Sequence, residues 1–338
     1  MKPTPHGSRR LALLIFPLLI LPLLVAQPGA TNAGQQIHNT REQAAPNDSG
    51  TLRFTVTVTG AKGGFITGLT KDNFSVWEGK TEREITYFRS DDLPLSVGVL
   101  VDVSGSIEAR TLAMAKYAVA KFVERSHRDN EYFVGEFNEG RRDLTGWTRD
   151  AQEILKGLDK IAVPPLGSQA NLKPRGQTAF YDACAVALEE VARRPNRKHV
   201  LLLITDGQDN HSRLTLDQLR RKVKESDVQI YGLSITDLNK RPDYYRVDGQ
   251  VILDELATES GGWVYFPGNK RELDESVERI ATELRHQYVI GFTPTNAARG
   301  GKWNKVKIKV TPPSGVSLKG SRARSREGYF SPVTTPAP

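Results

Sequence analysis

The sequence predicts an α/β fold in which a doubly wound, mostly parallel sheet is inserted into a small β-sandwich formed by the two flanks of the chain. Two observations support this prediction. The runs Val97–Val101 and Val200–Ile204 are almost wholly apolar, which is typical of strands buried on both faces of a parallel sheet. By contrast, residues 54–58 and 305–310 alternate apolar with polar side chains, which is typical of half-buried strands in an antiparallel sheet.

Residues 1–30 have the pattern of a secretory signal peptide. Basic residues precede the apolar stretch Leu11–Val25, and small residues follow it, with cleavage expected after Ala26, Ala30 or Ala33. The stretch is shorter than the roughly 20 apolar residues of a usual membrane span. We therefore predict an exported mature protein, periplasmic or secreted. The alternative is a protein anchored in the membrane by this segment when it is not cleaved.

The next segment, residues 31–50, is polar and is predicted to be a flexible linker. The first flank, residues 51–92, shows no long helical pattern, and glycine turns separate its short apolar segments. We therefore expect it to contribute the first part of the β-sandwich. Its predicted β segments are 54–58, 65–67, 75–78 and 84–89.

Strand patterns alternate with helix patterns throughout residues 95–286, which indicates a doubly wound α/β domain. The predicted strands are 95–101, 131–137, 200–204, 228–233 and 263–266. The predicted helices are 107–125, 150–160, 178–194, 216–225, 253–259 and 273–284. The chain contains a single cysteine, Cys184, so no disulfide within the chain is expected. The neighbours of Cys184 indicate a small, buried position of the third helix.

The second flank, residues 287–332, returns to a β pattern and is followed by a short tail, residues 333–338. Its predicted strands are 288–293, 305–310 and 328–330. The alternating arginines of residues 322–326 are expected on the exposed face of an edge strand, where charge discourages aggregation. Because the two ends of a domain usually lie close together, we expect both flanks to form one β-sandwich around the inserted domain.

Five oxygen-bearing residues are expected at the carboxyl edge of the parallel sheet, where open α/β sheets bind ligands. Asp102 ends the first buried strand, and Ser104 and Ser106 follow it. Thr178 lies in a loop that opens a helix, and Asp206 follows the second buried strand. Carboxylates and hydroxyls are hard oxygen donors that suit Mg²⁺, Mn²⁺ or Ca²⁺. The alternative is a Ser/Gly turn in which the first aspartate caps the next helix.

The same residues give the chain a resemblance to the von Willebrand factor type A (VWFA) domain. D-V-S-G-S at 102–106, G-Q-T-A at 176–179 and T-D-G-Q-D at 205–209 match the metal-ion-dependent adhesion site (MIDAS) of that family in order. The resemblance implies a Rossmann-like fold for residues 95–286. It also implies that the serines and the threonine contact the metal directly or through water, while the two aspartates act largely through bridging water.

Motifs beyond the metal site extend this resemblance to a family of exported bacterial proteins called VWFA-related. They are G-L-T-K-D-N-F at 68–74, G-Q-T-A-F-Y-D-A at 176–183 and G-Y-F-S-P at 328–332. The resemblance to that family covers about residues 51–332, so both flanks and the inserted segment are included.

The predicted function is a non-enzymatic interaction module that uses its cation to bind an acidic residue of a partner protein. One alternative is a structural subunit or scaffold of a cell-envelope assembly that docks through the β-sandwich. A further alternative is a metal-dependent hydrolase, but the sequence contains no H-E-x-x-H, G-x-S-x-G or phosphate-loop motif. The net charge of +8 is too small to indicate nucleic-acid binding, and no cofactor beyond the metal is expected.

Overall fold

The computed structural model describes residues 50–105, 107–162, 177–235, 244–294, 301–311 and 320–331. Residues 48–338 form one compact unit. The predicted signal peptide and the tail lie outside the described residues, as does the linker up to residue 49. None of the helices that the structure describes is long and apolar enough to cross a lipid bilayer.

A six-stranded sheet with the strand order β10-β9-β8-β5-β6-β7 forms the centre of the molecule. Its strands are β5 (Leu95–Asp102), β6 (Glu131–Phe137), β7 (Arg141–Asp143), β8 (Lys198–Ile204), β9 (Gln229–Leu233) and β10 (Trp263–Tyr265). All neighbours are parallel except β7, which pairs antiparallel with β6. Every residue of β5 and β8 is buried, as expected for apolar strands in the middle of a parallel sheet. The mostly parallel sheet is therefore confirmed.

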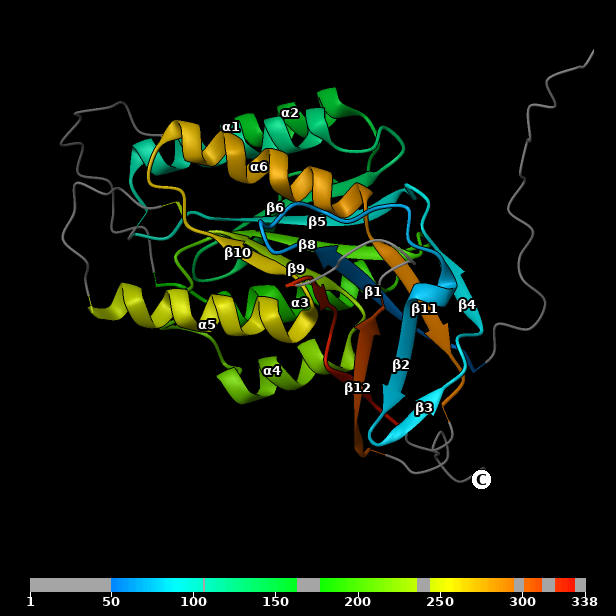
Figure 1. Ribbon diagram of the computed structural model, residues 1–338. Helices are drawn as coiled ribbons and strands as arrows, with labels where there is room; N and C mark the ends of the chain where they lie inside the picture. Colours follow the sequence, from blue (N-terminus) through cyan, green and yellow to red (C-terminus); the bar gives the residue numbers. More distant parts are fainter. Residues whose placement is uncertain are drawn as a thin grey trace, which may run out of the picture. The chain divides into compact units, whose positions relative to one another are not determined.

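Helices cover both faces of this sheet, as Figure 1 shows. One layer contains α1 (Ala109–Arg125), α2 (Ala151–Asp159) and α6 (Lys270–Arg285). The other contains α3 (Phe180–Ala192), α4 (Leu216–Glu225) and α5 (Tyr244–Ser260). Each layer closes its own apolar core against the sheet. The domain is thus doubly wound.

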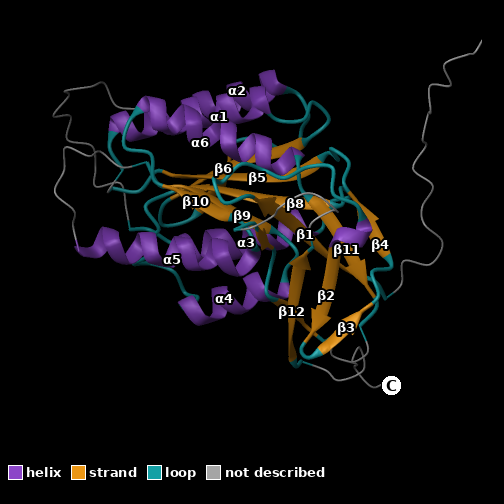
Figure 2. Ribbon diagram, viewed as in Figure 1, coloured by secondary structure: helices purple, strands orange, loops and turns teal. Residues whose placement is uncertain are grey.

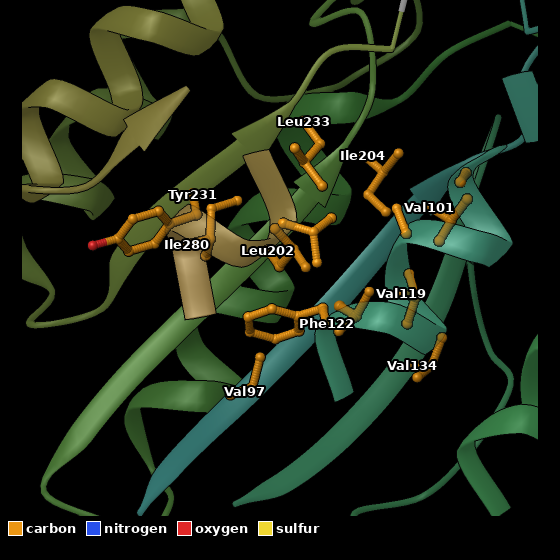
Figure 3. Packing of buried hydrophobic residues seen from close by; sticks show 14 of the residues in the cluster. Val97, Val101, Val119, Phe122, Val134, Leu202, Ile204, Tyr231, Leu233 and Ile280 are labelled. Atoms are coloured by element: carbon orange, nitrogen blue, oxygen red, sulfur yellow. The ribbon is translucent and has the colours of Figure 1, made fainter. Parts of the chain in front are cut away.

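The core beneath α1 and α6 is built from alternate residues of the central strands. Figure 3 shows Val97 and Leu202 of the sheet together with Phe122 of α1 and Ile280 of α6. All four side chains are fully buried. Burial of apolar area on this scale is the main stabilising contribution to such a domain, at about 25 cal/mol per Å².

The two flanks form two antiparallel four-stranded sheets, which appear in orange beside the helical part in Figure 2. The first sheet has the order β13-β1-β11-β4, with β1 (Leu52–Thr59), β4 (Tyr87–Arg89), β11 (Tyr288–Phe292) and β13 (Arg322–Arg324). The second has the order β14-β12-β2-β3, with β2 (Phe74–Glu78), β3 (Thr81–Arg83), β12 (Trp303–Val310) and β14 (Gly328–Phe330). A short 3₁₀ helix, η1 (Lys71–Asn73), precedes β2.

Each of these sheets combines strands from both flanks, so neither flank is complete without the other. In the first sheet β1 pairs with β11, and in the second β2 pairs with β12. Their inner faces share one apolar core that includes Phe54, Val76, Ile290 and Ile308. The prediction that the α/β domain is inserted into a β-sandwich is therefore confirmed.

The strand predicted at 65–67 is reduced to an isolated bridge between Phe65 and Thr59. Two further predicted elements differ from the structure. The helix predicted at 253–259 begins earlier and extends over Tyr244–Ser260. The predicted helix is too short because Gly249 interrupts the helical pattern of the first half. Only the second half of the strand predicted at 84–89 forms a strand, because only Tyr87–Arg89 pairs with β11. Ile85, which precedes it in the chain, is buried. Both differences arise from tertiary packing that outweighs a weak local pattern.

The prediction of an exposed arginine strand at residues 322–326 is wrong for two of its three arginines. Arg322 is exposed, but Arg324 forms an ion pair with Glu283, a buried residue of α6. Arg326 donates to the carbonyl oxygens of Ser226 and Arg53, at 3.0 and 2.9 Å. Although β13 is the outermost strand of its sheet, the α/β domain covers this side of it.

A candidate metal centre at the carboxyl edge of the sheet

Two carboxylates of the candidate centre leave neighbouring parallel strands at the same edge of the sheet. Asp102 is the last residue of β5 and is only 1% exposed. Its neighbour in sequence, Val101, pairs with Ile204, and Asp206 follows two residues later and is partly buried. The carboxylate of Asp206 lies close enough to act on the pKa of Asp102. The register of the two strands therefore brings these acids together, as the sequence predicts.

Both oxygens of Asp102 accept hydrogen bonds. The backbone N–H of Ser104 donates to Oδ1 at 2.9 Å, and the hydroxyl of Thr205 donates to Oδ2 at 2.7 Å. These bonds fix the orientation of the carboxylate and favour its ionised form. Ser104 itself is 1% exposed, so this end of the site excludes water.

Burial and the neighbouring charge of Asp206 raise the pKa of Asp102 to about 6. A buried carboxylate with a second carboxylate close by is unfavourable unless a positive charge compensates the pair. A cation would remove this conflict, whereas a purely structural helix cap would not need the second acid. The electrostatics of the pair therefore fit a bound metal ion.

The loop that carries Thr178 is hydrogen-bonded to the loop after β8. The backbone N–H of Thr178 donates to Asn210 Oδ1 at 2.7 Å, and its carbonyl accepts from the backbone N–H groups of Asn210 and His211 at 3.0 and 3.1 Å. The next residue, Ala179, donates to the carbonyl of Asn138 in the turn after β6 at 2.7 Å. Thr178 is 5% exposed and reaches the same edge of the sheet as the two aspartates.

Four of the five predicted ligands thus lie in loops or at a strand end along one edge of the sheet, and Ser106 lies outside the described residues. Within the described ranges, no three His, Cys, Asp or Glu side chains gather closely enough to hold a metal ion by themselves. A cation at this edge therefore needs hydroxyl oxygens beside the two carboxylates. Serine and threonine supply such oxygens, so the chemistry of the donor set fits a hard divalent cation.

The sequence reasoning missed two supporting features. The sequence indicates Thr205 only as part of the T-D-G-Q-D motif. In the structure its hydroxyl donates a hydrogen bond to Asp102 and accepts one from the backbone N–H of Gly207 at 3.1 Å. Gly207 has φ +81°, and a Cβ there would lie 2.1 Å from the carbonyl oxygen of Gly249 in α5. A hydroxyl residue that follows a buried strand can be recognised in the sequence, but the contact between Gly207 and Gly249 cannot.

Asp209, the last residue of the T-D-G-Q-D motif, has the role of a helix cap. Its Oδ1 accepts from the backbone N–H of Tyr181 in the first turn of α3 at 3.1 Å and from the hydroxyl of Ser212 at 2.5 Å. The bond from Tyr181 also ties the start of α3, and with it Thr178, to the loop that follows Asp206.

Comparison with known proteins agrees with this geometry. Residues 97–208 match the family model of the von Willebrand factor type A domain. Over 156 residues the chain is 30% identical to protein NorD of Brucella abortus, in an alignment that covers 42% of this chain and 24% of NorD. The chain thus spans about a quarter of the length of the curated relatives that it matches.

Two solved structures are similar to part of this chain at low sequence identity. BatB from Bacteroides thetaiotaomicron is 15% identical with a TM-score of 0.43, over 56% of this chain and 98% of BatB. Proximal thread matrix protein 1 from the mussel byssus, solved with a zinc-occupied MIDAS motif, is 17% identical with a TM-score of 0.44. That alignment covers 57% of this chain and 48% of the mussel protein.

Proposed function

We propose that this chain, whose residues 97–208 match the family model of the von Willebrand factor type A domain, is a non-enzymatic module that binds a partner protein through a divalent cation. The observation that carries the proposal is the pair Asp102 and Asp206. Both acids lie at one edge of the sheet, and burial together with the second charge raises the pKa of the first to about 6. A positive charge at this edge, such as a bound cation, would stabilise the ionised pair.

The proposed ligands are Asp102, Ser104, Ser106, Thr178 and Asp206. Their oxygens suit Mg²⁺, with Mn²⁺ or Ca²⁺ as alternatives. The two carboxylates only balance the charge of a bound dication and the other three ligands are neutral, so the cation can still attract an acidic side chain of the partner to an open coordination position. We infer that this acidic side chain supplies the remaining oxygen ligand.

The rest of the chain holds these oxygens in place before the cation arrives. Thr205 and the backbone of Ser104 orient the first carboxylate, and Asn210 holds the loop of Thr178. A site whose ligands are fixed beforehand loses less entropy on binding. We therefore expect the edge of the sheet to change little when the metal binds.

We further propose that the protein acts outside the cytoplasm. The proposal is supported by the basic start of the chain, the apolar stretch Leu11–Val25 and the small residues that follow it. The mature protein is then periplasmic or secreted, or stays anchored when the segment is kept. In each case the metal site faces a compartment in which partner proteins of the cell envelope are accessible.

The test is a binding titration with a partner captured from envelope extract, in Mg²⁺ and in EDTA. Wild type is compared with Asp102→Ala, which removes a ligand, and with Asp159→Ala, which removes an exposed acid at the end of α2. We expect partner binding by wild type and Asp159→Ala in Mg²⁺ alone, and none by Asp102→Ala. Equal binding under all conditions would refute the metal-dependent function and favour docking through the β-sandwich.

A further inference from the structure

The excess of positive charge is concentrated in the second flank of the chain. Residues 301–331 contain eight basic residues and one acidic residue, in a protein whose net charge is +8. Two of the eight, Arg324 and Arg326, point at the α/β domain and bind acceptors there. The lysines of the same segment have a different arrangement, because they follow the outer face of a strand.

Lys305, Lys307 and Lys309 alternate along β12 with Val306 and Ile308. The lysines are exposed, whereas the two apolar residues are buried in the core of the sandwich. Side chains two residues apart in a strand lie on the same face at a spacing of about 7 Å. The three lysine side chains therefore leave β12 on the outer surface of the sheet, and we call them the β12 row.

Aromatic rings lie beside this row on the same face. Trp77 of β2 is paired with Lys307, and Phe330 of β14 is paired with Trp303 at the start of β12. The ammonium group of Lys309 lies 4.3 Å from the centre of the Trp77 ring. Rings that are partly exposed beside lysines are typical of surfaces that meet lipid headgroups, because they are apolar at one end and polar at the other.

Helix α4 extends the positive surface past the edge of the sheet, as its position near β12 in Figure 1 indicates. Lys224 lies 5.8 Å from the Trp303 ring, and Arg221 lies 5.7 Å from the Phe330 ring. Between α4 and the sandwich is an open hollow of about 320 Å³, lined by Arg220, these two cations and Phe330 among others. Both cations of α4 also pair with carboxylates, Arg221 with Glu225 at 2.9 Å and Lys224 with Glu259 at 3.2 Å, and Asp217 lines the hollow as well. We therefore restrict the name basic face to the β12 row, Lys305, Lys307 and Lys309.

The lysines of β12 differ from other lysines of the surface in their partners. Lys121, Lys222 and Lys270 each contact a carboxylate of the protein, at 2.7, 2.7 and 2.8 Å. The three lysines of the β12 row form no ion pair with any residue that the structure describes. Their charge is therefore available to anions from outside the molecule.

We propose that the basic face docks the protein on a membrane surface rich in anionic phospholipids. The three lysines lie with the ring of Trp77 on the outer side of a β-sheet, and the paired cations of α4 lie beside them. This arrangement is complementary to a layer of phosphates more than to a single anionic chain. Each lysine near such a surface favours binding about fivefold, so the β12 row contributes about 100-fold.

The experiment measures sedimentation of residues 48–338, the compact unit of the structure, with lipid vesicles. The vesicles contain phosphatidylcholine with or without phosphatidylglycerol. The face variant carries Lys305→Gln, Lys307→Gln and Lys309→Gln. The control variant carries Lys116→Gln, Lys121→Gln and Lys270→Gln, which changes the net charge equally but removes lysines of α1 and α6 that pair with Asp159, Glu124 and Asp274.

We expect wild type and the control variant to bind the anionic vesicles only, and to be released by salt because exposed charges are screened. The face variant is expected to bind about 100-fold more weakly. Equal losses in both variants would show that net charge alone decides binding, and would overturn the proposal. Binding of wild type to a soluble acidic polysaccharide such as heparin, without binding to vesicles, would overturn it in favour of a glycan. Unchanged circular dichroism of both variants is the check on folding.

Discussion

Arg324 of β13 forms an ion pair with Glu283 of α6, and this pair joins the β-sandwich to the α/β domain. Glu283 is only 2% exposed and also accepts from the hydroxyls of Thr57 and Tyr231, at 2.8 and 2.6 Å. One buried carboxylate thus contacts hydrogen-bond donors of β1, β9 and β13. Burial and this carboxylate hold the pKa of Tyr231 well above its usual value, so the tyrosine remains a donor.

We expect Arg324→Gln to destabilise the protein by about 3–5 kcal/mol, because it leaves the charge of Glu283 buried without a counterion. Urea unfolding measures the change in the free energy of unfolding. Glu283→Gln removes that charge, so the double variant should be more stable than Arg324→Gln alone. An exposed pair, Arg271 and Glu275, serves as control, and its loss should cost less than about 1 kcal/mol. Purely additive effects of the two buried substitutions would contradict the ion pair as the link.

Gly98→Ala is expected to destabilise the central sheet by about 1–3 kcal/mol through overpacking. A Cβ at this position of β5 would lie 2.6 Å from the ring of Phe133 and 2.7 Å from Val191 of α3. Gly146→Ala is the matched control, because its Cβ would have no neighbour within 4 Å. Thermal unfolding of both variants measures the difference. Equal melting temperatures would show that α3 can move away from the sheet without cost.

Because of Lys198, we expect the free energy of unfolding to rise as the pH rises from about 8 to about 10. Burial lowers the pKa of this lysine from 10.5 to about 8, and its ammonium group donates to the carbonyl of Leu284 at 2.5 Å. Between these two pKa values the unfolded chain binds the proton and the folded chain does not, so raising the pH favours folding. The full effect is at most about 3 kcal/mol.

Lys198→Met removes this titrating group and keeps an unbranched side chain of similar length. We therefore expect its free energy of unfolding to lack the rise that wild type shows over this pH range. Denaturant unfolding at several pH values measures both proteins, and the difference between them isolates the one lysine. A parallel response of the two proteins would mean that Lys198 keeps its proton in the folded state.

The parts of the fold that follow from local patterns could be predicted from the sequence. The uninterrupted apolar runs of β5 and β8 identify buried parallel strands, and the alternation in β1 and β12 identifies half-buried ones. The sequence predicts all five candidate ligands at one edge of the sheet because parallel strands share a carboxyl edge, and the four that the structure describes lie there. To group these ligands, only the direction and order of the strands are needed, and the hydrophobic patterns of the sequence indicate both.

What could not be predicted depends on contacts between residues far apart in the chain. Arg324 and Arg326 follow an alternating pattern that is typical of an exposed edge, and nothing local indicates that Glu283 lies opposite. The same holds for Gly249, which the helical pattern disfavours but which the close approach to Gly207 requires. In each case a tertiary partner decides where the side chain lies.

Thr205 offers a test of how the candidate metal centre is organised, and this test rests on the proposed function. Its hydroxyl donates to Asp102 at 2.7 Å and is not one of the proposed ligands. Thr205→Val keeps the shape of the side chain but removes the donor. The carboxylate of Asp102 then loses one of its two orienting bonds, and we expect the affinity for Mg²⁺ to fall about 10- to 100-fold, as on loss of other hydrogen bonds that orient metal ligands.

Calorimetric titration with Mg²⁺ measures that affinity, and Thr205→Ser is the matched control because it keeps the hydroxyl. The melting temperature without metal separates this effect from a general loss of stability. If Thr205→Val bound Mg²⁺ as tightly as wild type, the hydroxyl would serve only the turn at Gly207. The orientation of Asp102 would then come from Ser104 alone, and the loop after β8 would contribute only through Asp206.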